Sequence, residues 1–369
     1  MLLIQQSQSA TLLRRIQESL STSEINNYKN NDNNSKSDDN ISTSSLNINN
    51  DGVDPIVIKG YKFFNSITGE NILIKGIDYY PRPNTGDLNV NSNDFFTEQY
   101  RHIWERDILQ FQALGINAIR LYSVDPKEDH SAFMCALSKA GIYALISLAS
   151  GACPTCAISP SKAPLCYPPQ LKTRGEAVIK EFSKYSNTLA FSAGNEVNHF
   201  VPLGSPPEWN APCLKKFVRD MRAYVAKCDH IRHIPVGLIM ADSDRDENTM
   251  YYNCQSDEND DLEHAEWYGI NTYVYCDGNA TSFDQSTGFQ SLSMSFQSYH
   301  YSIPVLLTEF GCLSKSFPTI DGYKGQRNFN QAKWLGLPEV QDGFAGGLAF
   351  EYSIEAANAQ TPFVSLYDL

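Results

Sequence analysis

The chain has 369 residues, enough for two average domains or for one large barrel. With 42% hydrophobic and 19% charged residues, its composition excludes a chain that is disordered throughout. A net charge of −13 without a basic stripe argues against nucleic-acid binding. No apolar run approaches the roughly 18 residues of a transmembrane span.

The N-terminal segment differs in amino-acid composition from the rest of the chain. Its apolar run Met1–Ile4 is too short for the core of a signal peptide, and basic residues soon follow. Residues 26–51 are rich in Asn, Ser and Asp and offer little to bury, so we expect disorder there. We therefore predict a low-complexity segment over residues 1–53 and one folded domain over residues 54–369.

After that segment, short apolar runs alternate with longer amphipathic stretches. Pro55–Lys59 and Tyr61–Phe64 predict a hairpin. Eight further apolar runs predict strands: Ile72–Tyr79, Ala118–Val124, Tyr143–Ala149, Leu189–Ala193, Pro235–Met240, Trp267–Tyr273, Pro304–Phe310 and Gly347–Tyr352. The stretches between them predict helices: Phe95–Leu114, Ser131–Ala140, Thr173–Tyr185, Leu214–Lys227, Leu292–Tyr299 and Gln331–Leu335.

Apolar strands that alternate with helices indicate a parallel sheet buried on both faces. Eight such units in one domain fit an α/β fold of the (β/α)8, or TIM-barrel, class, preceded here by the short hairpin. A doubly wound open sheet is the alternative. No Gly-rich dinucleotide fingerprint follows the first strand, so we favour the barrel.

Nine cysteines are many for a reduced protein. Cys153-Pro-Thr-Cys156 has the C-x-x-C spacing of redox and zinc sites, but no second C-x-x-C and no His pair complete a zinc site, so a disulfide that staples the loop is favoured. The odd total leaves at least one thiol unpaired, and Cys135 is our candidate. The sequence leaves the pairing of the others open: Cys153, Cys156, Cys166, Cys213, Cys228 and Cys254. The seven histidines form no ligand-spaced set, so we expect no metal and no cofactor.

Two predicted strands end in a carboxylate. One apolar run leads into Asn195-Glu196, and another leads into Thr308-Glu309. In a barrel the active site lies at the carboxyl ends of the strands, so both side chains point to one mouth. Paired carboxyl groups perform glycoside chemistry, about 5–5.5 Å apart in retaining enzymes and about 6.5–9.5 Å apart in inverting ones. Each Glu alone is as readily a solvated strand-end charge, but two at matching ends make that explanation weaker.

Other strand ends supply candidate partners. Arg120 has the charge to hold one Glu ionised, although a structural ion pair is the alternative. Asn195 has an amide that could bind a sugar 2-hydroxyl. Tyr273 and other strand-end tyrosines could stack on sugar rings, although packing alone is the commoner role.

Several motifs occur in a fixed order along the chain. They are Lys75–Tyr79, Asn117–Tyr122 followed by Asp125-Pro126, Asp129-His130, Ala193–Val197, Ile234–Gly237, Tyr268–Tyr273, Thr308–Cys312 and Gly346-Gly347. From about Ile56 to Tyr352 the chain thereby resembles the fungal-type β-1,3-glucanosyltransferases of glycoside hydrolase family 72.

The resemblance implies a (β/α)8 barrel and retaining chemistry without a cofactor, with β-1,3-glucan as donor and acceptor. Glu309 would be the nucleophile and Glu196 the acid/base. The positions that match substrate contacts of the family are Tyr79, Asn195, Asp242, Tyr273 and Tyr352, with Arg245 matching only in a shifted register. Arg120 is a further candidate substrate-binding residue because of its place at a strand end. The resemblance also implies a Cys276–Cys312 disulfide.

The chain departs from the family in places. The family's last-strand Tyr pair is Phe350 and Tyr352 here, and Trp104 stands where the family has a Cys. The resemblance implies the secretory pathway or the cell surface, although we find no signal peptide and no GPI tail in this chain. We expect a monomer. Two alternatives stay open: an endo-acting hydrolase of the same superfamily, and an inactive glucan-binding wall protein.

Overall fold

The computed structural model describes residues 52–81, 93–206, 208–277, 280–313 and 327–352. The low-complexity segment expected over residues 1–53 lies, apart from its last two residues, outside the described part of the chain. Its proposed boundary at residue 53 therefore stays a prediction.

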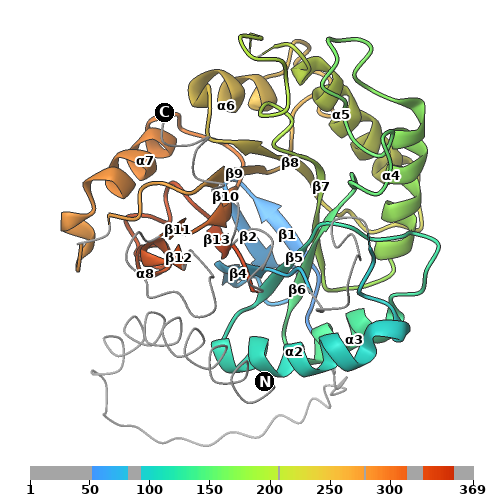
Figure 1. Cartoon of the computed structure of the whole chain (residues 1–369), viewed down its shortest axis with the longest axis horizontal. Coiled ribbons are helices and arrows are strands. Elements are labelled where there is room, and N and C mark those ends of the chain that lie inside the picture. The colour runs from blue at the N-terminus through green and yellow to red at the C-terminus, as the bar shows by residue number, and fades with distance from the viewer. Residues whose placement is uncertain (1–51, 82–92, 207, 278–279, 314–326, 353–369) are drawn as a thin grey trace, which may run out of the picture.

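Eight parallel strands close into a barrel in the order β10-β13-β4-β5-β6-β7-β8-β9 (Figure 1). Their bounds are β4 Ile74–Asp78, β5 Ala118–Leu121, β6 Tyr143–Ser147, β7 Thr188–Asn195, β8 Val236–Ala241, β9 Tyr268–Thr272, β10 Val305–Phe310 and β13 Gly346–Ala349. All eight predicted strands are confirmed, and closure excludes the open sheet. Nearly every residue of these strands is buried, as expected of a sheet covered on both faces.

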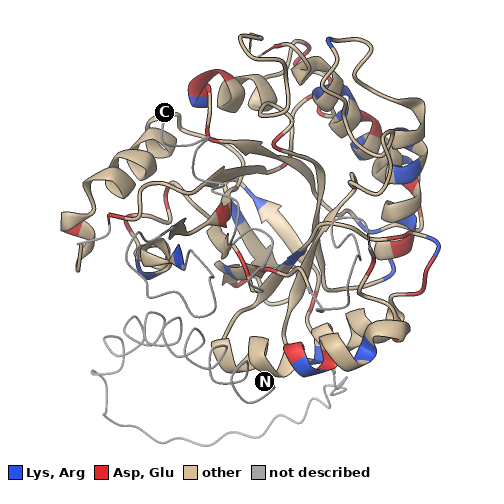
Figure 2. Ribbon diagram, viewed as in Figure 1, with Lys and Arg blue, Asp and Glu red and all other residues tan. Residues whose placement is uncertain are grey.

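Helices surround the barrel as an outer ring (Figure 1). They are α2 Arg101–Leu114, α3 Ser131–Lys139, α4 Pro169–Phe182, α5 Ala211–Lys227, α6 Arg245–Asn253, α7 Thr287–Ser298 and α8 Asn330–Leu335, with short 3-10 turns at Glu98–Tyr100 and Phe283–Gln285. Figure 2, a ribbon coloured by residue type, shows most of the charged residues on these helices and loops rather than on the barrel wall. None of the helices in the described ranges combines the length and the apolar character needed to cross a bilayer.

The predicted helices are confirmed, and α6 is the one that the sequence patterns missed. Its residues are almost all polar, so they show no apolar period. Tertiary packing stabilises this helix instead, because Tyr252 and Thr249 are fully buried. At the end of α2, Gly115 adopts φ 67°, a left-handed conformation that closes the helix.

The predicted hairpin closes one end of the barrel. Strands β1 Ile56–Lys59, β2 Lys62–Asn65 and β3 Asn71–Ile72 form an antiparallel sheet whose first two strands (blue) lie across the barrel in Figure 1. Ile56 and Phe63 pack against residues near the amino ends of the barrel strands, among them Ala118 and Tyr143. The Tyr143 hydroxyl donates to the Asp54 carbonyl at 2.7 Å. This end is therefore plugged, and the carboxyl ends of the strands are the end available for chemistry.

Three disulfides lie in the described residues, between Cys153 and Cys156, Cys166 and Cys213, and Cys276 and Cys312. The first confirms the predicted loop staple, and the third confirms the bridge implied by the family resemblance. Three cysteines are unpaired: Cys135, as predicted, together with Cys228 and Cys254. At the position of the missing family cysteine, the Trp104 indole donates to the Thr97 carbonyl and its ring is buried.

Candidate active site

Glu309 lies in β10 near its carboxyl end and is 5% exposed. Its carboxylate accepts hydrogen bonds from three side chains that lie on β5 or just beyond β5 and β9. Arg120 Nη1 and the Tyr122 hydroxyl donate to Oε1 at 2.9 and 2.8 Å, and the Tyr273 hydroxyl donates to Oε2. Three donors, one of them a cation, therefore hold the Glu309 carboxylate in a fixed orientation.

Arg120 connects this carboxylate to the rest of the mouth. Its Nη1 also donates to the Thr308 carbonyl at 3.1 Å, and its Nη2 donates to Asn195 Oδ1 at 2.7 Å. The guanidinium lies 4.2 Å from the centre of the Tyr122 ring. Burial acts to lower the pKa of Arg120, but the nearby Tyr122 and Glu309 raise it above its usual range, so the group stays charged.

Glu196 follows β7 in an unusual backbone conformation. Its φ of 50° is left-handed, and the turn is held by two backbone bonds, from Glu196 N to Ile239 O and from His199 N to Glu196 O, both at 2.9 Å. Such conformations cost free energy and are concentrated at functional sites. Asn271 Nδ2 donates to Glu196 Oε1 at 2.8 Å. Burial, followed by the charge of Glu309, raises the pKa of Glu196 to about 7.

Asn271 on β9 joins the two acids into one network. Its Nδ2 contacts both Glu196 Oε1 and, at 3.1 Å, Asn195 Oδ1, which in turn accepts from Arg120. Arg120 then donates to Glu309. The two carboxyl groups thus share one mouth but differ in their partners: Glu309 accepts from a cation and two hydroxyls, whereas Glu196 accepts from the Asn271 amide. Among the described residues, no group of three or more His, Cys, Asp or Glu side chains is arranged to hold a metal ion.

Asp242 and Arg245 form a second polar pair beyond the end of β8. Arg245 donates from Nε and Nη2 to the two Asp242 oxygens, each at 2.7 Å, and from Nη2 to the Tyr275 hydroxyl at 2.9 Å. Asn198 ties the turn that carries Glu196 to the same strand end, because its side chain bonds both the N–H and the carbonyl of Ala241. The predicted residues Asp242 and Arg245 therefore lie together, next to the acid turn.

Comparison with known proteins identifies this architecture. The family model described as glucanosyltransferase matches residues 45–365. The chain belongs to the glucanosyltransferase family.

Curated relatives carry the same family name. The chain is 34% identical over 306 residues to the 1,3-beta-glucanosyltransferase PGA4 of Candida albicans, covering 82% of this chain and 60% of that protein. It is 34% identical over 311 residues to GAS5 of Saccharomyces cerevisiae, covering 84% of this chain and 58% of that protein. The chain thus spans about three fifths of the length of these relatives.

Solved structures of one relative share the fold. Saccharomyces cerevisiae Gas2p in complex with laminaripentaose superimposes with a TM-score of 0.67 at 30% identity, covering 82% of this chain and 62% of that one. Gas2p in complex with laminaritriose and laminaritetraose gives a TM-score of 0.66 at the same identity and coverage.

Two residues that resemble substrate contacts of the glucanosyltransferase family lie outside the carboxylate network. The hydroxyls of Tyr79 and Tyr352 both donate to Asp107 of α2, at 2.9 and 3.1 Å, and Arg106 Nε donates to it at 2.8 Å. Tyr79 has no exposed surface. The last strand ends at Ala349 rather than at Tyr352, so Tyr352 follows the strand and packs against α2 and β4. In this chain, both tyrosines contribute to a buried aromatic cluster.

Sequence reasoning assigned no role to Asn271 or Arg327. Asn271 ends an apolar run in an amide, as Asn195 does, and that parallel was the available signal. Arg327 lies on β12 Arg327–Asn328, and its guanidinium is 4.6 Å from the centre of the Tyr273 ring and 5.2 Å from that of Phe350. No local pattern marks that position, because the contact is created by the fold.

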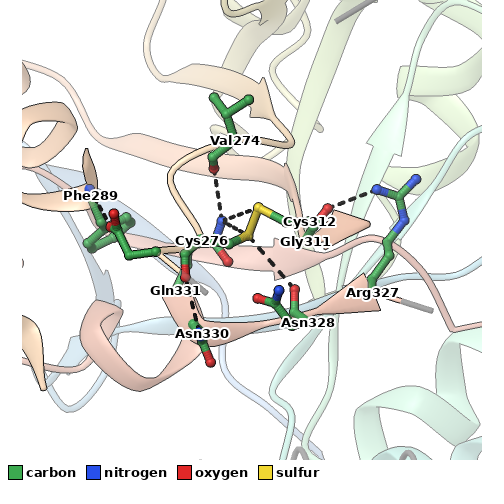
Figure 3. The surroundings of a disulfide bond; sticks show 10 residues. Val274, Cys276, Phe289, Gly311, Cys312, Arg327, Asn328, Asn330 and Gln331 are labelled. Carbon is green, nitrogen blue, oxygen red and sulfur yellow. Dashed lines mark hydrogen bonds between the residues drawn. A yellow bond between two sulfur atoms is a disulfide. The ribbon is translucent and has the colours of Figure 1, made fainter. Parts of the chain in front are cut away.

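The Cys276–Cys312 disulfide braces the segments that follow β9 and β10 (Figure 3). Gln331 of α8 points at it from the side, donating from Nε2 to the Val274 carbonyl at 3.2 Å and to Cys276 Sγ at 2.9 Å. Cys312 begins β11 Cys312–Leu313, three residues after Glu309. The disulfide therefore ties the chain beyond Glu309 to the chain beyond Tyr273.

Proposed function

We propose that this chain is a retaining β-1,3-glucan transglycosylase, with Glu309 as nucleophile and Glu196 as acid/base. One observation carries the proposal: two carboxyl groups share one hydrogen-bonded mouth, and only Glu309 is bonded by a cation and two hydroxyls. A raised pKa suits Glu196 to the role of acid, and the cation beside Glu309 suits it to the role of nucleophile. Membership of the glucanosyltransferase family and the laminari-oligosaccharides bound to Gas2p support β-1,3-glucan as the substrate.

In the first half-reaction, Glu309 attacks the anomeric carbon of the donor glucan while Glu196 gives its proton to the departing glycosidic oxygen. A covalent glycosyl-enzyme results, and Glu196 becomes a carboxylate. A pKa of about 7 leaves Glu196 largely protonated in mildly acidic solution, so it starts the cycle as an acid. Arg120, Tyr122 and Tyr273 hold Glu309 oriented until it reacts.

In the second half-reaction, Glu196 removes the proton from a glucan 3-hydroxyl, which attacks the glycosyl-enzyme and releases Glu309. The product is an elongated chain when a sugar occupies the acceptor position before water reacts. Asn195, Asp242 and Arg245 lie beside the acid and are the proposed sugar contacts, with Asn195 placed for the 2-hydroxyl. Because Tyr79 and Tyr352 are held by Asp107, we propose that they shape the mouth from behind.

The setting of the reaction is also a proposal. Three disulfides in the described residues support an oxidising compartment, and therefore the secretory pathway or the cell surface. We propose that the protein acts as a monomer, because its barrel is closed and its wall has no unpaired edge strand.

Product analysis tests the proposal. The purified chain is incubated with a reduced laminari-oligosaccharide, and the products are separated by length. Transfer yields products longer than the substrate, together with the complementary short fragments. Only shorter products would replace the proposal with hydrolysis, and unchanged substrate would replace it with glucan binding without turnover. Covalent labelling of Glu309 by a 2-fluoro glycosyl reagent provides an independent check of the nucleophile.

A further inference from the structure

Asp78 is a buried acid next to the nucleophile that the reaction above does not use. It ends β4 and has no exposed surface, and neither of its oxygens has a hydrogen-bond partner in the part of the chain that the structure describes. The groups that act on it are Arg120 of β5, Tyr122 beyond β5, Glu309 of β10 and Glu351 beyond β13. A buried carboxylate without donors is costly, so its protonation state needs an explanation.

The Arg120 side chain donates to Glu309 and not to Asp78. Its Nη1 lies 3.6 Å from Asp78 Oδ1, which is too long for a hydrogen bond, while the same nitrogen donates to Glu309 and to the Thr308 carbonyl. Its Nη2 is directed to Asn195. The single positive charge is therefore engaged by Glu309, and Asp78 is left without a cation in hydrogen-bond contact.

Tyr122 completes the hydrogen-bond inventory. A phenol carries one proton, and Tyr122 donates it to Glu309 Oε1 at 2.8 Å. The same hydroxyl also interacts with the Asp78 carboxyl, but only its lone pairs remain for that contact. Two acceptors that face each other repel, whereas a protonated Asp78 would donate to the phenol oxygen. Burial raises the pKa of Asp78 well above its usual range. Arg120 and Tyr122 act in the opposite direction and Glu309 and Glu351 add to the rise, so the net direction favours the protonated acid.

We propose that Asp78 is a neutral carboxylic acid that donates a hydrogen bond to the Tyr122 oxygen and so strengthens the bond from Tyr122 to Glu309. It is a positioning residue that acts through Tyr122, because hydrogen bonds in a chain polarise one another. The inference rests on the proposed function of Glu309 as nucleophile.

A neutral Asp78 also balances charge over the whole cycle. Before the donor reacts, Arg120 is positive, Glu309 is negative, and both Glu196 and Asp78 are neutral. In the glycosyl-enzyme, Glu309 is an uncharged ester and Glu196 is the anion, so the sum is again zero. An ionised Asp78 would add a negative charge to a buried site in both states, and it would compete with each acid in turn for Arg120.

Two variants at this position distinguish an Asp78 that donates a hydrogen bond to Tyr122 from an Asp78 that is a charged partner of Arg120. Asp78→Asn keeps a group that can donate to Tyr122, and Asp78→Leu removes it while keeping the branching at Cγ. We expect Asn to retain kcat/KM within about threefold, and Leu to lose roughly 10- to 100-fold, the effect of weakening one donor to a reacting group. In the Leu variant the acid limb of the kcat/KM profile moves to higher pH, since Glu309 is less well stabilised as an anion. The Asn variant keeps the acid limb of the wild type.

Three further measurements complete the test. Asp107→Asn is the matched control, because it alters an equally buried aspartate without contact to Tyr122, and its acid limb should not move. The double variant Asp78→Leu/Tyr122→Phe should lose little more kcat/KM than Tyr122→Phe alone, because both substitutions act through the hydrogen bond from Tyr122 to Glu309. The infrared difference spectrum of wild type minus Asp78→Asn should contain the carbonyl band of a protonated carboxylic acid, a readout that does not depend on the Leu variant folding.

The outcomes that overturn the inference are distinct from failure of the proposed function. Equal, large losses in the Asn and Leu variants, or a carboxylate band in the difference spectrum, would identify Asp78 as a charged partner of Arg120. Wild-type rates in both variants would show that the contact has no role. Failure of the unmodified chain to act on a laminari-oligosaccharide would instead reject the function itself.

Discussion

Two buried clusters of acids and tyrosines lie side by side in this barrel, and they differ in whether their polar atoms have hydrogen-bond partners. Around Asp107, both carboxyl oxygens are occupied by the hydroxyls of Tyr79 and Tyr352 and by Arg106 Nε. Around Arg120, by contrast, the Arg120 Nε and both oxygens of Asp78 have no hydrogen-bond partner among the described residues. The first cluster is saturated and the second is not.

This difference indicates that the Asp107 cluster stabilises the fold and that the Arg120 cluster serves the reaction. Buried polar groups in folded proteins are nearly always satisfied, so a saturated cluster of this kind contributes to stability. Unsatisfied groups and left-handed backbone persist where the surrounding fold holds them for a task, and the Arg120 cluster is adjacent to Glu196 at φ 50°. Substitutions in the two clusters should therefore fail in different ways, one in folding and the other in catalysis.

The largest effect is expected at the two acids. Glu309→Gln removes the nucleophile, and Glu196→Gln removes the proton donor, with little change of shape in either case. We expect transfer from laminari-oligosaccharides to fall at least about 10³-fold in each variant. The measurement is the initial rate of product formation, with thermal unfolding to confirm that the fold is intact. A variant that kept wild-type rates would remove its residue from the mechanism.

Asp107→Asn should produce the reverse pattern. The amide keeps one acceptor oxygen but directs an NH2 group toward donors that the carboxylate had accepted. We expect a loss of about 2–4 kcal/mol in the free energy of unfolding, as for other buried charged hydrogen bonds that lose one partner. Both limbs of the pH–rate profile should stay in place. If stability were unchanged while the profile moved, the contrast between the two clusters would be wrong.

The barrel could be predicted from the sequence because its strands are continuous apolar runs that repeat with regular spacing. Both acids could be located for the same reason, since each lies at the carboxyl end of such a run. Helix α6 could not, because its residues are polar and only its packing stabilises it. Where local pattern and tertiary environment agree, sequence is sufficient.

The partners of the acids were harder to predict than the acids themselves. Tyr79 stands at a strand end like a ligand contact, but its hydroxyl is captured by Asp107 from a helix 28 positions away. Arg327 reaches Tyr273 across 54 positions, and no sequence period links them. Side-chain direction depends on which neighbours supply donors, and that is decided by the folded structure rather than by spacing along the chain.

The smallest predicted effect concerns the proton on Glu196. Glycosylation needs this group protonated, and burial and the charge of Glu309 raise its pKa to about 7, so kcat/KM should fall as pH rises through about 7. Asn271 donates to Glu196 and favours its ionised form. In Asn271→Ala the pKa of Glu196 therefore rises, and the alkaline limb moves to higher pH by about half a unit. Tyr122→Phe is the matched control, because it removes a donor from Glu309 and should leave that limb unmoved. A shift of the Asn271→Ala limb to lower pH would mean that Asn271 stabilises the protonated acid instead, and it would reverse the assignment of which carboxyl group starts the cycle with the proton.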